Sequence, residues 1–315
     1  HVSLVGSEMC IRDSYWNRSI PILSKWPGFN EQFTIEGRAP IEGEIWYNHN
    51  LANTLELLAN EGRDAFYKGF IAEQIDQYMQ KNGGFLAYED MSSHKGDWIE
   101  PVSTNYRGYD VWQLPPNGQG IAVLQILNLM ELFDLSNMDS MSADYVHLFT
   151  EVKKIVYEDR AKYYSDISFN DIPVVELISK EYASKRSELI DLKNARDSIP
   201  AGSPGNYGDT IYLTTADSEG NMVSLIQSNY RGMGSGMTPP GLGFILQDRG
   251  EMFSLDRAHM NRLEGGKRPF HTIIPGFVTK NNEPWLSFGL MGGAMQPQGH
   301  AQILINMIDF NMDVQ

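Results

Sequence analysis

Cysteine is almost absent from this sequence, because the 315 residues hold a single one, Cys10. One cysteine cannot close a disulfide within the chain, so no structural disulfide is expected. Histidine is also sparse, and the seven histidines lack the close spacing that a zinc site or a redox pair needs. We therefore expect no bound metal.

Basic residues and long apolar runs are scarce as well. The 25 lysines and arginines stand against 40 aspartates and glutamates, which gives a formal net charge of -15. This excess argues against a nucleic acid or an anionic membrane as the main partner, although a local basic site can still hold an anion. No apolar run is long enough to span a bilayer. With 42% hydrophobic residues, the composition is typical of a globular enzyme with a large core.

The two ends of the chain differ from the rest. His1–Ser14 has no clear periodicity and no signal-peptide layout, and it resembles a translated sequencing-adapter tail. We expect residues 1–14 to be non-native, which would make Cys10 foreign and the chain a fragment. Residues 296–315 have the pattern of a helix that stops abruptly. The compartment is unknown from this sequence, so cytoplasmic, periplasmic and secreted locations all stay open.

Apolar periodicity predicts helices in the first part of the chain and strands after residue 209. The expected helices cover residues 50–60, 64–81, 121–133 and 142–164, and Asn82-Gly83-Gly84 should end the second one. The expected strands cover residues 106–114, 210–217, 222–228, 272–279 and 285–290. Helices followed by paired strands are typical of a layered α+β domain.

The most informative segment is the junction Gly208-Asp209-Thr210, where a glycine-rich loop enters a predicted strand. Cutting the bond before Thr210 would free its α-amine, whose unperturbed pKa is roughly 8. That amine could take the proton from the threonine's own hydroxyl, so that one residue supplies both nucleophile and base. A threonine that begins a strand is otherwise an ordinary β-branched residue in its preferred backbone. The junction alone leaves both interpretations open.

Several further motifs favour the catalytic interpretation. After the junction they are Gly208–Gly236, Phe244–Gly250, Gly266–Pro269 and Met291–His300, and before it Glu61–Gly69, Gly83–Leu86 and Leu114–Gly120. Taken in their order along the chain, these motifs resemble those of the γ-glutamyltranspeptidase family, and the likeness covers nearly everything after residue 35. The resemblance implies an α+β fold, the αββα sandwich of N-terminal nucleophile hydrolases.

The resemblance also implies a division of the chain into two subunits of one interleaved domain. Residues 15–209 would be the C-terminal part of a mostly helical large subunit. Residues 210–315 would be the N-terminal part of a strand-rich small subunit that begins at the catalytic threonine.

Catalytic roles follow from the same resemblance. Thr210 would attack the carbonyl of Asp209 during maturation and the amide of a substrate afterwards. Ser228 stands where the family usually has a threonine that hydrogen-bonds the nucleophile, with an ordinary strand serine as the alternative. Gly292 and Gly293 match the pair whose backbone N–H groups form the family's oxyanion hole, where one donor typically contributes roughly 3 kcal/mol. The alternative for the glycines is a turn between a strand and a helix.

The substrate-binding positions depart from the family pattern. Met252 replaces the acidic residue that would hold the α-amino group of a γ-glutamyl substrate, and Glu251 lies beside it. His271 and Thr272 replace the paired serines that would bind the α-carboxylate. Arg249 stands where the family often has glutamine; a guanidinium suits a bidentate grip on a carboxylate, with a surface arginine as the alternative. These changes resemble the acylase-like branch, which includes enzymes similar to cephalosporin acylase and oxamate amidohydrolase.

The resemblance thus implies a self-processing amidohydrolase that needs no cofactor. Its expected partners are a γ-glutamyl or related acyl amide, water or an amine as acceptor, and the two subunits of one precursor; neither nucleic acid nor a membrane span is expected. A glutathione hydrolase or γ-glutamyltransferase-like activity is the first hypothesis, with hydrolysis favoured over transfer. A related acylase and a non-cleaving binding protein are the alternatives. A serine hydrolase is disfavoured because Gly234-Ser235-Gly236 lacks the spacing of a nucleophile elbow.

Overall fold

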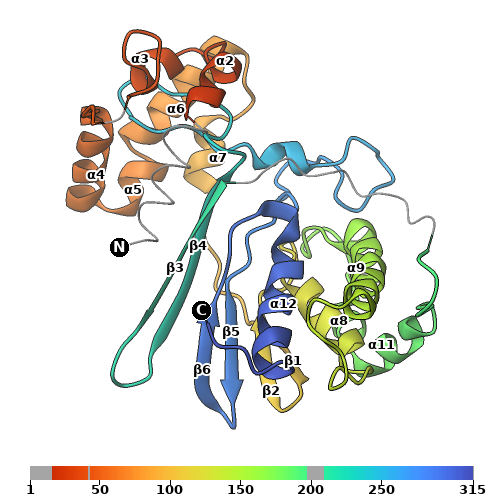
Figure 1. The fold of residues 1–315 in the computed structure, drawn as a ribbon. Coiled ribbons are helices and arrows are strands. Elements are labelled where there is room, and N and C mark those ends of the chain that lie inside the picture. The colour runs from red at the N-terminus through yellow and green to blue at the C-terminus, as the bar shows by residue number, and fades with distance from the viewer. Residues whose placement is uncertain (1–15, 42, 197–208, 315) are drawn as a thin grey trace. The chain divides into compact units, whose positions relative to one another are not determined.

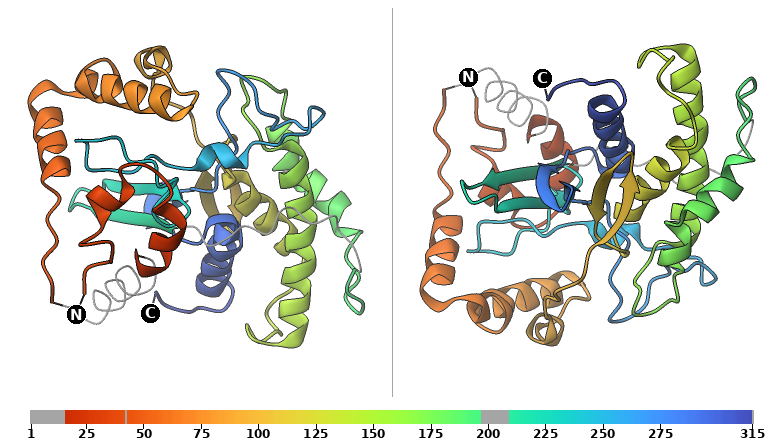
Figure 2. Two further views of the ribbon diagram at one scale, coloured as in Figure 1. Left: turned by 90° about the horizontal axis from the view of Figure 1, so that it is seen from above. Right: turned by 90° about the horizontal axis from the view of Figure 1, so that it is seen from below.

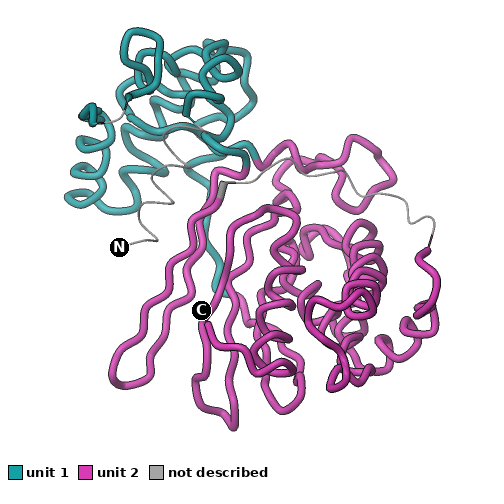
Figure 3. The backbone as a smooth tube through the Cα atoms, in the orientation of Figure 1, with its two compact units in different colours: residues 1–98, 231–248 teal, residues 99–230, 249–315 magenta. Residues whose placement is uncertain are grey.

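The computed structural model describes residues 16–41, 43–196 and 209–314. The expected tail at residues 1–14 and the loop before Asp209 lie outside them. The described residues form two compact units, one from residues up to 98 together with 231–248, the other from residues 99–230 and 249–315 (Figure 3). The subunit boundary at 209/210 stays a prediction, because compactness says nothing of a cut in the chain.

The first unit is helical. Its helices are α2 (Asn17–Leu23), α3 (Phe29–Phe33), α4 (His49–Glu61), α5 (Arg63–Tyr67), α6 (Phe70–Asn82) and α7 (Tyr88–Ser93). Asn48 begins α4, since its side chain accepts a hydrogen bond from the N–H of Leu51 at 2.9 Å and donates one to the carbonyl of Gly243 at 2.7 Å. One cap thus also fixes the returning segment 231–248.

The expected helix over residues 64–81 is two helices, α5 and α6, because the chain breaks at Lys68 and Gly69. Gly69 passes so close to α5 that a Cβ there would lie 3.1 Å from the carbonyl oxygen of Ala65. The predicted end of the second helix is present, since Gly83 adopts a left-handed conformation with φ 72°.

The second unit carries its helices against a sheet. These helices are α8 (Gly120–Met130), α9 (Ala143–Tyr163), α10 (Val174–Leu177), α11 (Lys180–Ser187) and α12 (Gln296–Ile308). Every residue of α8 is buried, as expected of a sequence that is apolar on nearly all sides, and α8 packs against α9, α12 and the first two strands (Figure 1). Helix α12 ends at Ile308, earlier than the expected end at residue 315.

A four-stranded antiparallel sheet lies beneath these helices in the order β1-β2-β5-β6. The strands are β1 (Val102–Tyr106), β2 (Tyr109–Gln113), β5 (Gly276–Lys280) and β6 (Glu283–Phe288). The expected strand over 106–114 corresponds to β2, which pairs with the unexpected strand β1 in a hairpin; the two-residue turn at Arg107 and Gly108 has φ 50° and φ 87°. Such positive angles suit the right-handed twist of a tight hairpin.

The strands expected over 272–279 and 285–290 are shifted: β5 begins at Gly276 and β6 ends at Phe288. The segment before β5 does not join the ladder because side chains take its backbone groups. Gln119 donates to the carbonyl of Thr272, and the N–H of Ile274 donates to the side chain of Gln296.

The remaining strands, β3 (Asp209–Ala216) and β4 (Met222–Tyr230), form a separate hairpin. It lies on the other side of the sheet from α8 and α12 (Figure 2). Side chains on one of its faces contact the sheet, as where Ser224 donates to the carbonyl of Gly276 at 3.0 Å. Its other face exposes four apolar side chains, which are Ile211, Leu213, Val223 and Leu225. The layers of helices, sheet and hairpin confirm the α+β class.

Candidate active site

Thr210 lies near the start of β3 and exposes only 1% of its surface. The pairing of β3 with β4 shifts register between Asp209 and Ile211, so that Ser228 and Asn229 both lie opposite Thr210. This is a β-bulge, a device that re-aims a side chain locally. The described residues include the backbone of Asp209 in β3 but not its side chain.

The hydroxyl of Thr210 donates to the hydroxyl of Ser228, with 3.2 Å between the two oxygens. Ser228 Oγ also accepts from the backbone N–H of Tyr230 at 2.8 Å. A second hydrogen bond to the same oxygen fixes the Ser228 rotamer, and with it the direction in which the Thr210 hydroxyl points. We call Thr210 and Ser228 the nucleophile strip.

Tyr230 links the nucleophile strip to Arg249. It is a buried non-glycine residue with φ 81°, a conformation that costs free energy and persists only where its surroundings hold it. The guanidinium carbon of Arg249 lies 5.2 Å from the centre of the Tyr230 ring. Arg249 begins the short 3-10 helix η2 (Arg249–Met252), is buried, and donates to Thr272 Oγ1 at 3.1 Å.

Some of the other expected substrate-binding residues lie beside Arg249, and others do not. Thr272 is buried against it, and His271 is half-buried beside it. Burial and then the positive charge of Arg249 lower the pKa of His271 to about 4, so the imidazole is neutral at neutral pH. Glu251 is exposed on η2, and Met252 is half-buried there. Arg249, His271 and Thr272 therefore come together, whereas Glu251 points to a different environment.

Gly292 and Gly293 lie between β6 and α12, where the chain forms the 3-10 helix η3 (Gly293–Met295). Their φ angles are 130° and 57°, and a Cβ on Gly292 would lie 2.8 Å from Met295 Sδ. Directly after them begins the 13-residue α12, whose N-terminal end carries partial positive charge. We call residues 292–294 the glycine strip.

Three side chains that were not expected hold the glycine strip. Gln119 Nε2 donates to the carbonyl of Gly293 at 2.9 Å, while Arg160 and Tyr157 both donate to the carbonyl of Ala294, at 3.0 Å and 2.7 Å. No motif singled them out individually. Gln119 lies within the motif Leu114–Gly120, and Tyr157 and Arg160 are one turn apart on the helix expected over 142–164.

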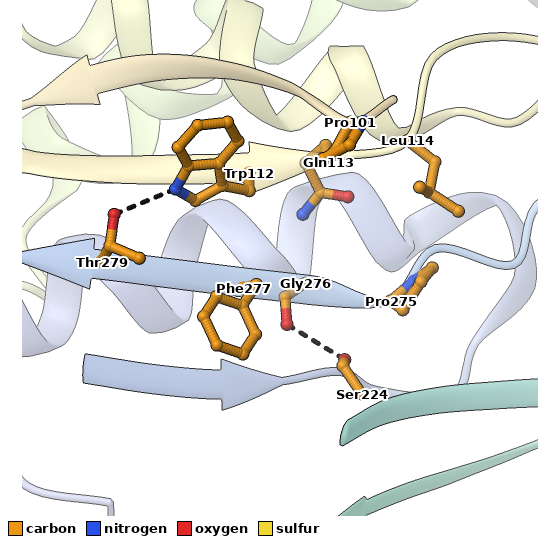
Figure 4. A pocket seen from close by; sticks show the side chains of 9 residues that line it. All are labelled: Pro101, Trp112, Gln113, Leu114, Ser224, Pro275, Gly276, Phe277 and Thr279. Atoms are coloured by element: carbon orange, nitrogen blue, oxygen red, sulfur yellow. Dashed lines mark hydrogen bonds between the residues drawn. The ribbon is translucent and has the colours of Figure 1, made fainter. Parts of the chain in front are cut away.

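A cavity in the second unit lies away from these residues. It has a volume of about 340 Å³ and lies between the sheet and the hairpin (Figure 4). Apolar and small residues line it: Pro101, Trp112, Gln113, Leu114, Ser224, Pro275, Gly276, Phe277 and Thr279. None of the expected site residues is among them, so the candidate site is defined by its hydrogen bonds and not by this cavity.

Two classes of feature are not found in the part of the chain that the structure describes. No cluster of three or more Cys, His, Asp or Glu side chains is arranged to hold a metal ion. Nor does any described helix combine the length and apolar character needed to cross a membrane.

Comparison with known proteins agrees with the motifs. The model of the γ-glutamyltranspeptidase family matches residues 11–315. The glutathione hydrolase-like YwrD proenzyme of Bacillus subtilis is 39% identical over 311 residues, which are 99% of this chain and 58% of that protein. The glutathione hydrolase proenzyme of Escherichia coli is 34% identical over 90% of this chain and 51% of that protein.

A solved structure also matches this chain closely. The crystal structure of cephalosporin acylase from Bacillus halodurans matches with a TM-score of 0.88 and 42% identity, over 96% of this chain and 56% of that one. The chain thus spans a little over half the length of its relatives. On these matches and motifs, the chain belongs to the γ-glutamyltranspeptidase family, in its acylase-like branch.

Proposed function

We propose that this chain belongs to a self-processing amidohydrolase whose nucleophile is Thr210. The observation that carries the proposal is the hydrogen bond from Thr210 to Ser228 at the buried, bulged start of β3. A threonine needed only for strand propensity requires neither a hydroxyl partner nor a bulge. The names of the relatives, which include proenzymes and an acylase, support the same chemistry.

Maturation would cut the bond between Asp209 and Thr210. Thr210 Oγ attacks the carbonyl carbon of Asp209, the C–N bond breaks, and the nitrogen takes up the hydroxyl proton, which leaves an ester and a free α-amine. Water then hydrolyses the ester. The products are a large-subunit segment that ends at Asp209 and a small-subunit segment that begins at Thr210, and the two stay together as partners from one precursor.

Catalysis would repeat the same chemistry on a substrate. The α-amine accepts the hydroxyl proton while Thr210 Oγ attacks the substrate amide. The glycine strip would stabilise the resulting oxyanion through backbone N–H groups, and Ser228 would orient the hydroxyl. The amine product leaves with the proton, and water attacks the acyl ester; an amine in its place would give transfer. Hydrolysis is the primary proposal.

The substrate would be an acyl amide with a carboxylate on the acyl group. The guanidinium of Arg249 lies over the ring of Tyr230, and the backbone N–H of Tyr230 donates to Ser228 Oγ in the nucleophile strip. A guanidinium at this place suits a carboxylate. Neutral His271 leaves Arg249 as the charge that would set this preference. A γ-glutamyl amide is the second candidate, favoured by Glu251 on the same short helix as Arg249.

The test compares wild type, Thr210→Ala and Thr210→Ser in a precursor that carries this chain. We expect wild type and the serine variant to be cut at 209/210 and to release amine from dicarboxylic monoamides. The alanine variant should stay whole and lose activity by on the order of 10⁴-fold or more. An alanine variant that is still cut there would refute the role of Thr210. A wild type that folds but stays uncut and inactive would favour the non-cleaving binding protein.

A further inference from the structure

We propose that Gln119 is a positioning residue for the glycine strip and that Arg160 holds Gln119 in place. The proposal rests on the proposed function, since it concerns the groups that would stabilise the oxyanion. It adds two residues that act through other groups and are not expected to touch the substrate.

Gln119 joins two segments of the site through one side chain. It caps the N-terminal end of α8 and is completely buried. Its amide nitrogen has two hydrogens and donates to two carbonyls, that of Thr272 at 2.7 Å and that of Gly293 at 2.9 Å. It therefore sets the spacing between the segment that includes Arg249's partner Thr272 and the glycine strip.

Arg160 fixes Gln119 from the other side. Its guanidinium donates to Gln119 Oε1 at 2.6 Å and to the carbonyl of Ala294 at 3.0 Å. This orients the amide, because an amide with its oxygen toward Arg160 must present its nitrogen to the two carbonyls. The guanidinium also lies 3.9 Å from the centre of the Tyr157 ring, and Tyr157 itself donates to Ala294.

These contacts matter because the glycine strip has little rigidity of its own. Gly292 and Gly293 lack the Cβ atoms that restrict backbone angles, so their N–H groups could point in many directions. The pinned carbonyls of Gly293 and Ala294 belong to the two peptide planes that directly follow the glycine pair. Fixing these planes anchors the chain on the C-terminal side of the pair and so limits the directions that the N–H groups of Gly292 and Gly293 can take. Preorganised N–H groups are what an oxyanion hole requires.

A matched control lies on the same helix. Gln125 is also buried, donates to Asp159 at 2.9 Å and accepts from the hydroxyl of Tyr164 at 2.5 Å. Neither partner belongs to the glycine strip or to the segment around Thr272. Loss of Gln125 should therefore cost stability alone, while loss of Gln119 should cost stability and rate.

The experiment measures kcat, KM and thermal midpoint for Gln119→Ala, Gln119→Glu and Gln125→Ala in the precursor that carries this chain. Gln119→Ala should lower kcat about 10- to 100-fold, with a smaller change in KM, because misplaced groups fail chiefly in the transition state. Gln119→Glu keeps an acceptor for Arg160 but turns an oxygen towards the carbonyls of Thr272 and Gly293, so it should lower both the midpoint and kcat. Gln125→Ala should lower the midpoint and keep kcat within about twofold.

Three outcomes would overturn the inference or its basis. Gln119 variants with wild-type kcat would refute the positioning role while the proposed function stands. An equal loss of kcat in Gln125→Ala would reduce the effect to general destabilisation, which also refutes it. A folded wild type without cleavage or amidase activity would refute the proposed function itself, and the inference would fall with it.

Discussion

The nucleophile strip and the glycine strip are held in place by different means. Thr210 and Ser228 are positioned by the pairing of two neighbouring strands and by a bulge, so most of the holding contacts are local to one hairpin. Residues 292–294 are positioned by side chains of Gln119, Tyr157 and Arg160, which lie more than 130 residues earlier in the chain. One half of the candidate site depends on backbone pairing and the other on buried polar side chains.

Because they are held differently, the two strips should be disrupted by different substitutions. Strand pairing uses backbone groups that only a proline substitution removes, so most side-chain substitutions should harm the nucleophile strip only when they remove its own hydroxyls. A strip held by side chains can fail through residues that never approach the substrate. Variants of the two strips therefore test the comparison directly.

Among variants that keep Thr210, the largest effect should come from changing the glycine strip itself. Gly292→Ala places a Cβ at φ 130° and 2.8 Å from Met295 Sδ, so the backbone must rotate. We expect kcat to fall about 10²- to 10³-fold, the usual cost of a lost oxyanion donor. The measurement is steady-state kinetics beside the thermal midpoint.

The control for Gly292 is Gly265→Ala, because a Cβ on Gly265 would meet no heavy atom within 4 Å. Its kcat should stay at the wild-type value. A Gly292→Ala enzyme with unchanged kcat would mean that the glycine strip takes no part in the reaction.

A smaller loss is expected in the nucleophile strip from Ser228→Ala. This variant removes the acceptor of the Thr210 hydroxyl and of the Tyr230 N–H, so kcat should fall about 10- to 100-fold through lost orientation. Ser228→Thr keeps the hydroxyl and should stay within a few-fold of wild type. Single-turnover rates of acylation would measure the effect before product release intervenes.

Ser224→Ala is the matched control for Ser228 on the same face of β4. Its hydroxyl donates to the carbonyl of Gly276 and contacts the hydroxyl of Tyr212 at 2.8 Å. Removing it should cost about 1 kcal/mol of stability without a loss of kcat. If both serine variants lose kcat equally, the hydroxyl of Ser228 has no special role.

Arg249 should affect substrate binding more than rate. Arg249→Lys keeps the positive charge but loses the planar guanidinium, which donates to Thr272 and would also bind a substrate carboxylate through two N–H groups. KM for a monoamide of a dicarboxylic acid should rise about tenfold with kcat nearly unchanged. KM for an uncharged amide should not change. If Arg249→Lys leaves KM for the dicarboxylic monoamide at the wild-type value, as it should for the uncharged amide, Arg249 does not bind a substrate carboxylate.

The last effect concerns stability in acid and not the reaction. His300 is completely buried against Phe288, and burial lowers its pKa to about 3, while the pKa of His271 is lowered to about 4. In the unfolded chain both imidazoles take up a proton near pH 6.5, whereas in the folded chain they stay neutral down to about pH 4. The free energy of unfolding is therefore highest above pH 6.5 and falls as the pH drops towards 4, by about 1.4 kcal/mol per pH unit for each histidine.

Urea midpoints measured between pH 7 and pH 4.5 would check this dependence. His300→Gln should flatten it, because glutamine can accept from Gln113 without taking up a proton. His94→Gln, at an exposed position in the other unit, should leave the slope unchanged. A wild-type slope that His300→Gln does not alter would contradict the buried, neutral imidazole.

Much of the fold follows from local signals in the sequence. The largely apolar run of α8, the glycine stop after α6 and the turn between β3 and β4 each act within a few residues, and each was expected. Strand β1 was missed because Ser103, Thr104 and Asn105 make its sequence mostly polar, and only the aromatic strand that follows the turn, β2, was expected. The start of β5 was misplaced because distant glutamines take the backbone groups of residues 272–274.

The candidate site divides in the same way. Thr210, Ser228 and the glycines could be proposed from motifs, because their chemistry depends on residue type at a given position. Gln119 and Arg160 could not, because their role depends on which carbonyls the fold brings within 3 Å. A polar residue on a long helix looks the same in sequence whether it faces water or a buried backbone.

The most direct test of Thr210 as the nucleophile is intact mass with N-terminal sequencing of the folded precursor that carries this chain. Two pieces are expected, the smaller beginning Thr-Ile-Tyr-Leu-Thr at residue 210. A single uncut chain, or a cut at any other bond, would contradict Thr210 as the nucleophile.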